Sequence, residues 1–210
     1  MFRTAAEQTK ISSAAHRVRT RIAMRCTAAL LAVCAVFTTA SCTPNGAAVG
    51  DTQDHQPAIA HAGIQRADML ISLIGSTDVD RDRLVLTAFA TAKLHASYVS
   101  TSQVSDPVTA AQQGVIDMTN QQVHVIIISG IDVTDNTADS WAQTLEAPRE
   151  AGIPVVLLEP QTAPQNTQLY AAVFTINDRA TDATPIDQAI DAVINDEPHE
   201  RDMMVTTNVA

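Results

Sequence analysis

The pattern of hydrophobic positions is dominated by one unbroken apolar run, Val123–Gly130, in which His124 is the only polar residue before the closing serine and glycine. A strand that does not alternate between apolar and polar residues is buried on both faces. A second run of this kind, Gly152–Glu159, follows after one helix-sized segment. Two buried strands joined in this way predict a right-handed βαβ unit.

Other segments extend this alternation of strands and helices toward the N-terminus. Met69–Ile74 is a short apolar run, and Arg81–Leu94 repeats its apolar residues at helical spacing. Residues 96–101 alternate as expected of a strand near a sheet edge. Asp106 and Pro107 predict the start of another helix, with Asp106 as N-cap and proline in the first helical position.

Further elements are predicted toward the C-terminus. An acidic loop, Ile131–Asp139, precedes a helix in which Pro148 predicts a kink or break, because proline removes a helical hydrogen bond and crowds the preceding turn. Residues 171–176 are predicted as a fifth strand. The last helix is expected to begin at Thr184-Pro185, with an N-cap and a proline at the first position. Beyond it, only a short strand around Met203–Thr207 is expected.

The order of these elements predicts an α/β fold. It is a single doubly wound, five-stranded parallel sheet with strand order 2-1-3-4-5 and helices on both faces. With 210 residues, 46% of them hydrophobic, the chain can form one domain with a sizeable core and a tail. Ligands of such sheets bind beyond the carboxyl ends of the strands, so a site is expected in residues 129–139 and 159–165.

Residues 1–42 have the pattern of a secretory signal. Several arginines precede an apolar segment, residues 26–37, that is too short to span a membrane comfortably, and small residues lead to Cys42. This resembles a bacterial lipoprotein signal, which implies that Cys42 is the lipid attachment site and holds the protein on the outer side of the bacterial cell membrane. Ordinary secretion, with Cys42 incidental, is the alternative. Met24 is a candidate for the true start.

Residues 43–66 contain Pro, Gly, Ala, Gln, Asp and His without periodicity, which predicts a flexible tether. The folded domain is expected at residues 67–195, followed by a tail at 196–210.

Cysteine content and charge exclude several functions. All three cysteines lie in the first fifth of the chain, so the predicted domain has no thiol for a disulfide, a zinc site or a nucleophile, and we expect neither a metal nor a cofactor. After Cys42 the chain has seven basic and 22 acidic residues, a net charge of −15. Such a surface repels phosphate backbones, which excludes nucleic acid as a partner.

Several short motifs resemble the N-terminal lobe of type I periplasmic sugar-binding proteins of bacterial ABC transporters. They are Ser105-Asp106-Pro107, Gln113-Gly114, the run ending in Ser129-Gly130, and Glu150-Ala151-Gly152-Ile153-Pro154-Val155-Val156. The resemblance covers about residues 67–193. It implies a lipid-anchored solute-binding protein that binds a small sugar at the carboxyl ends of the strands and works with a transporter permease.

The resemblance also implies candidate ligand-binding residues. Asp178 matches an aspartate that commonly faces the ligand, Trp141 is a candidate for stacking on a sugar face, and Asp132 is a looser match. A helix residue packed on the sheet is the alternative for Trp141, and a loop cap is the alternative for Asp178. The chain has Glu159-Pro160 where the family often has aspartate-arginine.

Proteins of this family have two similar lobes with the ligand between them, and the chain ends where a second lobe would start. We therefore expect a single lobe, which pairs with a second-lobe chain if it binds sugar tightly. A structural or interaction lipoprotein that keeps the fold without binding ligand is the alternative. An enzyme is disfavoured, because the domain has no glycine-rich phosphate loop and no nucleophile elbow, and we predict no catalytic residues.

Overall fold

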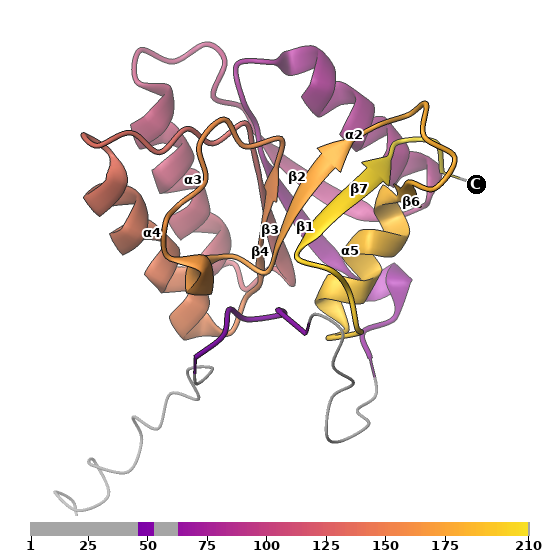
Figure 1. The fold of residues 1–210 in the computed structure, drawn as a ribbon. Coiled ribbons are helices and arrows are strands. Elements are labelled where there is room, and N and C mark those ends of the chain that lie inside the picture. Colours follow the sequence, from indigo (N-terminus) through magenta and orange to yellow (C-terminus); the bar gives the residue numbers. More distant parts are fainter. Residues whose placement is uncertain (1–45, 53–62, 210) are drawn as a thin grey trace, which may run out of the picture. The chain divides into compact units, whose positions relative to one another are not determined.

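A computed structural model describes residues 46–52 and 63–209 (Figure 1), and all of these belong to one compact unit of the chain. In this part of the chain an all-parallel, seven-stranded sheet has the strand order β2-β1-β3-β4-β5-β7-β6. The strands are β1 (Leu70–Ile74), β2 (His95–Val99), β3 (Val125–Ser129), β4 (Val155–Leu158), β5 (Ala172–Ile176), β6 (Thr184–Pro185) and β7 (Asp202–Thr206).

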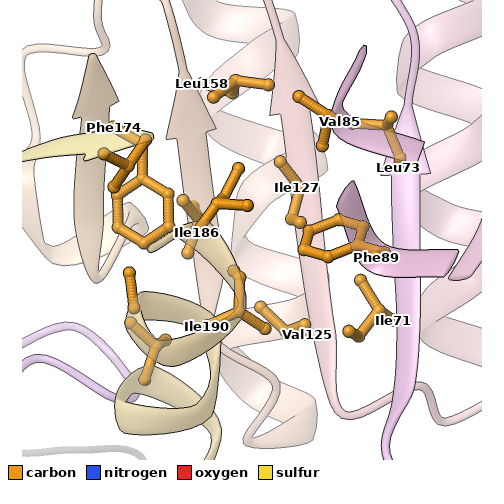
Figure 2. Packing of buried hydrophobic residues seen from close by; sticks show 14 of the residues in the cluster. Ile71, Leu73, Val85, Phe89, Val125, Ile127, Leu158, Phe174, Ile186 and Ile190 are labelled. Carbon is orange, nitrogen blue, oxygen red and sulfur yellow. The ribbon is translucent and has the colours of Figure 1, made fainter. Parts of the chain in front are cut away.

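Two layers of helices cover the sheet (Figure 1). The helices are α2 (Val79–Thr91), α3 (Pro107–Asn120), α4 (Ala138–Ala151) and α5 (Ile186–Ile194), with short 3₁₀ helices η1 (Arg66–Asp68) and η2 (Thr167–Leu169). Helices α2 and α5 pack on one face and α3 and α4 on the other. Figure 2 shows the first of these layers, in which Phe89 of α2 and Ile190 of α5 face the side chains of the central strands.

The position of β3 between two layers of helices explains why its sequence does not alternate between apolar and polar residues. All five of its residues are buried. Ile127 contributes to the apolar cluster under α2 and α5, whereas Ile126 and Ile128 contribute to the cluster under α3 and α4. Because successive side chains of a strand point to opposite faces, a strand covered on both sides must be apolar throughout.

The prediction of five strands is wrong, although the order of the first five is confirmed. Strand β7 pairs with β5, with Phe174 opposite Met203, and the two-residue β6 pairs with β7. Only Val205 and Thr206 of β7 are buried, so the strand lacks the apolar run by which the buried strands are recognised. The short strand expected around Met203–Thr207 is confirmed as β7, and the predicted tail at 196–210 therefore contributes a strand to the sheet.

Two helix predictions also need correction. Helix α5 begins at Ile186, with Pro185 as its N-cap residue and Thr184 in β6, one position later than predicted. Helix α4 continues through Pro148 without a break. Pro148 lies in the last turn, where it removes only one hydrogen bond, and the helix ends at Gly152 in the left-handed conformation.

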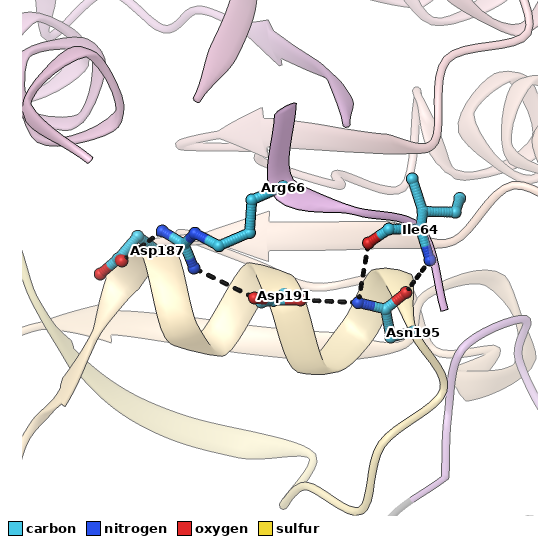
Figure 3. A network of polar contacts seen from close by, with 5 residues as sticks. All are labelled: Ile64, Arg66, Asp187, Asp191 and Asn195. Carbon is cyan, nitrogen blue, oxygen red and sulfur yellow. Dashed lines mark hydrogen bonds and ion pairs between the residues drawn. The ribbon is translucent and has the colours of Figure 1, made fainter. Parts of the chain in front are cut away.

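The described parts of the predicted tether contact the domain. The carbonyl of Gly50 lies 2.7 Å from His199 Nε2, and Asp51 forms an ion pair with Arg201. Closer to β1, Arg66 binds two aspartates of α5, and Asn195 binds the backbone of Ile64 (Figure 3). The folded unit is therefore wider than residues 67–195.

Cys42 and the rest of the predicted signal segment, residues 1–42, lie outside the described residues. Among the helices that are described, none has the length and apolar character needed to cross a membrane.

Candidate functional site

The strand order places a crevice between the carboxyl ends of β1 and β3. The chain leaves β1 toward β2 on one side, whereas β3, β4 and β5 follow on the other side, and the loops after β1 and β3 diverge at this point. A cavity of about 150 Å³ lies here, which we call the switch-point cleft. It is lined by Gly75, Ser76, Thr77, Thr101, Pro107, Val108, Ala111, Ile128, Ser129, Gly130, Ile131, Asp132, Trp141 and Gln161.

The first wall of the cleft is the loop after β1, which Asp82 holds in place. The Asp82 side chain is 1% exposed and accepts hydrogen bonds from Ser76 N at 2.8 Å and from the Tyr98 hydroxyl at 3.0 Å. Burial, and then the hydrogen bond to Asp82, raise the pKa of Tyr98. A Cβ atom at Gly75 would lie 2.5 Å from the Tyr98 hydroxyl, so only glycine fits between these groups.

The second wall is formed by the segments after β3 and β4, which run side by side. Gln161 N donates to the carbonyl of Ile131 at 2.8 Å, and Asp132 forms an isolated β-bridge with Thr162. These bonds place Asp132 and Gln161 at the rim of the cleft. Gly130 has a φ of +63°, which lets the chain turn sharply after the last residue of β3.

The third wall comes from helices α3 and α4. Asp106 caps α3 by accepting hydrogen bonds from the hydroxyl and the N–H of Thr109, and these bonds lower the pKa of Asp106. The first residues of α3 then reach the cleft. Trp141, in the first turn of α4, is 3% exposed and belongs to the apolar cluster under α3 and α4.

Two polar atoms of the lining residues have no hydrogen-bond partner among the described residues. They are Ser129 Oγ, at the end of β3, and Trp141 Nε1. Buried polar groups in folded proteins are rarely left unpaired, and such groups point to a missing partner. Among the described residues of the lining, Asp132 has the only charged side chain.

The structure brings two of the three predicted site residues together, since Asp132 and Trp141 both line the switch-point cleft. Asp178 does not line it. Its carboxylate accepts hydrogen bonds from Thr207 N at 2.6 Å and from the Thr206 and Thr207 hydroxyls at 2.9 and 2.8 Å. These bonds are those of a loop cap that fixes the end of β7.

Ser129 and Gln161 of the cleft lie in the two segments where a site was expected, residues 129–139 and 159–165. Sequence reasoning missed Ser76 and Thr101. Ser76 follows β1, one of the two strands that flank the crevice, so its position at the switch point is a signal that could have found it. Thr101 carries no such signal. Glu159, noted as a departure from the family pattern, turns toward β5, where its carboxylate accepts a hydrogen bond from Ile176 N at 2.5 Å.

Two other cavities differ from the cleft in position or lining. One of about 300 Å³ lies at the amino ends of β3 and β4, the end at which parallel sheets do not usually bind ligands. Another of about 360 Å³ lies between the segments that follow β3 and β4 and includes Asp135 and Asp139. Neither is lined by a residue whose buried polar side chain lacks a partner in the described parts. Within residues 46–52 and 63–209, no group of three or more metal-ligating side chains is arranged to hold a metal ion.

Comparison with known proteins gives matches only among solved structures. No family model matches the chain, and no curated protein matches it. A protein from Mycobacterium smegmatis, solved in complex with β-D-fucofuranose, is 14% identical with a TM-score of 0.43, over 66% of this chain and 54% of that one. The periplasmic binding protein component of the arabinose ABC transporter from Shewanella sp. ANA-3, bound to α- and β-L-arabinofuranose, is 12% identical with a TM-score of 0.41, over 66% and 55%.

These likenesses concern the fold alone. The chain spans about half the length of the two solved structures.

Proposed function

We propose that the domain binds a small, neutral, hydroxyl-rich ligand, a sugar, in the switch-point cleft. The observation that carries this proposal is the composition of the lining. One carboxylate, that of Asp132, belongs to a cleft whose other lining residues with polar side chains are neutral: Ser76, Thr77, Thr101, Ser129, Trp141 and Gln161.

The chemistry of these groups selects against anionic ligands. An ionised carboxylate only accepts hydrogen bonds, so Asp132 favours a ligand with hydroxyl donors and repels an anion. Hydroxyl and amide side chains both donate and accept, which suits the many hydroxyls of a sugar. The volume of about 150 Å³ is below the range of about 300–1,000 Å³ usual for drug-sized ligands. A monosaccharide is therefore the largest ligand that we expect.

In the cell, this site would belong to a lipid-anchored, extracytoplasmic solute-binding protein of a carbohydrate ABC transporter. The pattern of residues 1–42, with Cys42 as the acceptor of the lipid, supports the anchor and the location. The proposed partners are a permease and a second-lobe chain that closes over the sugar. The proposed role is binding, without catalysis.

The second candidate is a structural or interaction lipoprotein that keeps the fold without binding a ligand. The well-packed β3 and its two apolar layers are needed in either case. The polar residues that line the switch-point cleft, with Asp132 among them, favour a ligand.

Isothermal titration of the full chain with D-galactose, L-arabinose and D-glucuronate tests the proposal. We expect a neutral sugar to bind with a dissociation constant near millimolar, because a small cleft encloses only part of the ligand. D-glucuronate should bind more weakly. Asp132→Asn should weaken the binding of the neutral sugar about 10-fold.

Asp178→Asn is the matched control, because it makes the same change outside the cleft and should leave the affinity unchanged. Absence of binding by any neutral sugar would leave the structural or interaction lipoprotein as the better account. Equal effects of Asp132→Asn and Asp178→Asn would place the site elsewhere.

A further inference from the structure

We infer that His199 attaches residues 46–52 to the domain in a pH-dependent manner, and that the attachment is complete only while both nitrogens of its imidazole ring carry a proton. Loss of one of these protons removes one of the two contacts of the ring and weakens the attachment of the segment. The inference concerns the chain before β1 and is independent of sugar binding.

Both ring nitrogens of His199 lie at hydrogen-bond distance from a backbone carbonyl oxygen. Nδ1 is 2.8 Å from the oxygen of Glu200, and Nε2 is 2.7 Å from the oxygen of Gly50. The second contact joins residues that lie 149 positions apart in the sequence. His199 is 6% exposed, so water has little access to replace either contact.

The chemistry of these contacts requires the charged ring. A carbonyl oxygen only accepts hydrogen bonds, so each contact needs a ring nitrogen that donates. A neutral imidazole has one donor nitrogen and one acceptor nitrogen, whereas the imidazolium cation has two donors. In the neutral ring of His199, one nitrogen lone pair would face a carbonyl oxygen at 2.7 or 2.8 Å. Only the protonated ring can make both hydrogen bonds at once.

His124 has the opposite arrangement and serves as an internal contrast. Its Nδ1 accepts a hydrogen bond from Leu70 N at 3.0 Å, so this nitrogen must be without a proton. The structure therefore contains one histidine whose contacts need the cation and another whose contact is lost on protonation of Nδ1.

The charged groups near His199 favour the cation. Asp51 of the attached segment forms an ion pair with Arg201. The ring of Tyr170 lies 5.7 Å from the guanidinium of Arg201, and burial raises the pKa of Tyr170, so this phenol stays neutral. The other charged residues of segments 46–52 and 195–202 are Asp196, Glu197, Glu200 and Asp202. Since acids outnumber the arginine, their field favours a proton on the ring.

The other contacts of the segment do not depend on pH in the same range. The hydroxyl of Thr52 donates to the carbonyl of Glu197 at 2.5 Å, and this bond contains no titratable group. The guanidinium of Arg201 keeps its charge in proteins. His199 is therefore the group that makes the attachment respond between about pH 5 and pH 8. Detachment would move the point at which the chain leaves the domain to Ile64, which Asn195 binds.

Two measurements on the full chain test the inference at about pH 5 and about pH 8, on either side of histidine titration. In a sample with ¹⁵N-labelled histidine, the nitrogen shifts show which ring nitrogens carry a proton. We expect two protonated nitrogens on His199 at the lower pH and one at the higher pH. Hydrogen exchange reports the attachment, because the N–H groups of Asp51 and Thr52 bond to carbonyls within the segment.

Protection of these two amides, corrected for the intrinsic effect of pH, should fall about 10-fold between the two conditions, the size of one lost hydrogen bond. His199→Gln should show the lower protection at both pH values, because its amide carries no charge that a change of pH could remove. The matched control is His95→Gln, since His95 is exposed on β2 and should leave the behaviour of the parent unchanged. If His199→Gln fails to fold, the ¹⁵N titration and the exchange of the parent decide.

A His199 ring with one bare nitrogen at about pH 5, or protection of Asp51 and Thr52 that does not change with pH, would overturn the inference. Equal pH dependence in His199→Gln and the parent would assign it to another group and overturn the inference as well. None of these results bears on the proposed function, because no sugar is present in the measurements.

Discussion

The carboxylate of Asp178 accepts hydrogen bonds from both the backbone N–H and the hydroxyl of Thr207, at 2.6 and 2.8 Å. The two residues lie on different elements, since Asp178 follows β5 and Thr207 follows β7. Their contact fixes the carboxyl ends of two neighbouring strands to one another. These hydrogen bonds therefore account for the position of the Asp178 side chain without a ligand.

The first prediction concerns acid stability through Asp178. Burial would raise the pKa of Asp178, but the hydrogen bonds from Thr207 and Thr206 outweigh it and lower the pKa. A lowered pKa contributes stability that is present above the ordinary aspartate pKa and is lost as the pH falls through the lowered value. Asp178→Asn should lower the free energy of unfolding by about 1 kcal/mol at neutral pH, after allowance for the exposure of the side chain.

Denaturant melts between neutral pH and pH 3 measure this contribution. The variant should lose less stability than the parent over this range. Asp182→Asn, in the same loop, serves as the control and should follow the parent. A variant with the same pH dependence as the parent would contradict the assignment.

The second prediction concerns Arg66, which joins the segment before β1 to helix α5 (Figure 3). Its guanidinium binds Asp187 at 2.6 Å and Asp191 at 3.0 Å. Burial would lower the pKa of Arg66, but its bonds to Asp187 and Asp191 raise it. Asp187 is 8% exposed, so removal of Arg66 leaves a nearly buried carboxylate without its cation.

Arg66→Ala should therefore destabilise the domain by about 2 kcal/mol, below the full cost of breaking a buried pair because Arg66 itself is partly exposed. The control is Arg83→Ala, since the pair of Arg83 with Asp80 lies at the surface. Ion pairs at the surface contribute about 0–1 kcal/mol to the free energy of unfolding. Urea melts of the two variants should differ clearly, and equal losses would show that the Arg66 pairs are no stronger than a surface pair.

The third prediction concerns Pro148, in the last turn of α4. Proline in a helix costs about 3 kcal/mol relative to alanine, but here its ring is buried and alanine would lose that packing. We expect Pro148→Ala to stabilise the domain by about 1 kcal/mol, measured as a higher urea midpoint. A lower midpoint would mean that packing of the ring exceeds the cost of the missing hydrogen bond.

The fourth prediction concerns Cys42, which lies outside the described residues. A lipid on this cysteine should appear as incorporation of radioactive fatty acid in bacteria, together with retention in the membrane fraction. Cys42→Ser should abolish both. Cys34→Ser, eight residues earlier in the same segment, is the matched control and should leave the label unchanged. Equal label in Cys42→Ser and the parent would exclude acylation at this position.

Much of the sheet could be predicted from the sequence, because burial on both faces leaves an unmistakable apolar run in β3 and β4. Strand β6, which was missed, and β7, which was expected only as a short strand outside the five-stranded sheet, have no such run. Strand β6 has two residues, and β7 is buried only at Val205 and Thr206. Their place in the sheet depends on the pairing of β7 with β5 and of β6 with β7, which are tertiary contacts and not local patterns.

The site was predictable only in part, for a related reason. Asp132 could be placed near the cleft, because it follows a buried strand on the side where ligands bind. The hydrogen bonds that Thr206 and Thr207 donate to Asp178 join residues that lie 28 and 29 positions apart in the sequence. Likewise, Trp141 Nε1 has no partner among the described residues, and this is a property of the packed helix that has no sequence signature.

The attachment of residues 46–52 to the domain determines how the protein would stand on a membrane. Gly50 contacts His199, and a Cβ atom at Gly50 would lie against Pro154, at the amino end of β4. With a lipid on Cys42, the four chain steps to Gly46 reach at most about 14 Å. The amino ends of the strands would then lie close to the bilayer, and the switch-point cleft would open on the side away from it.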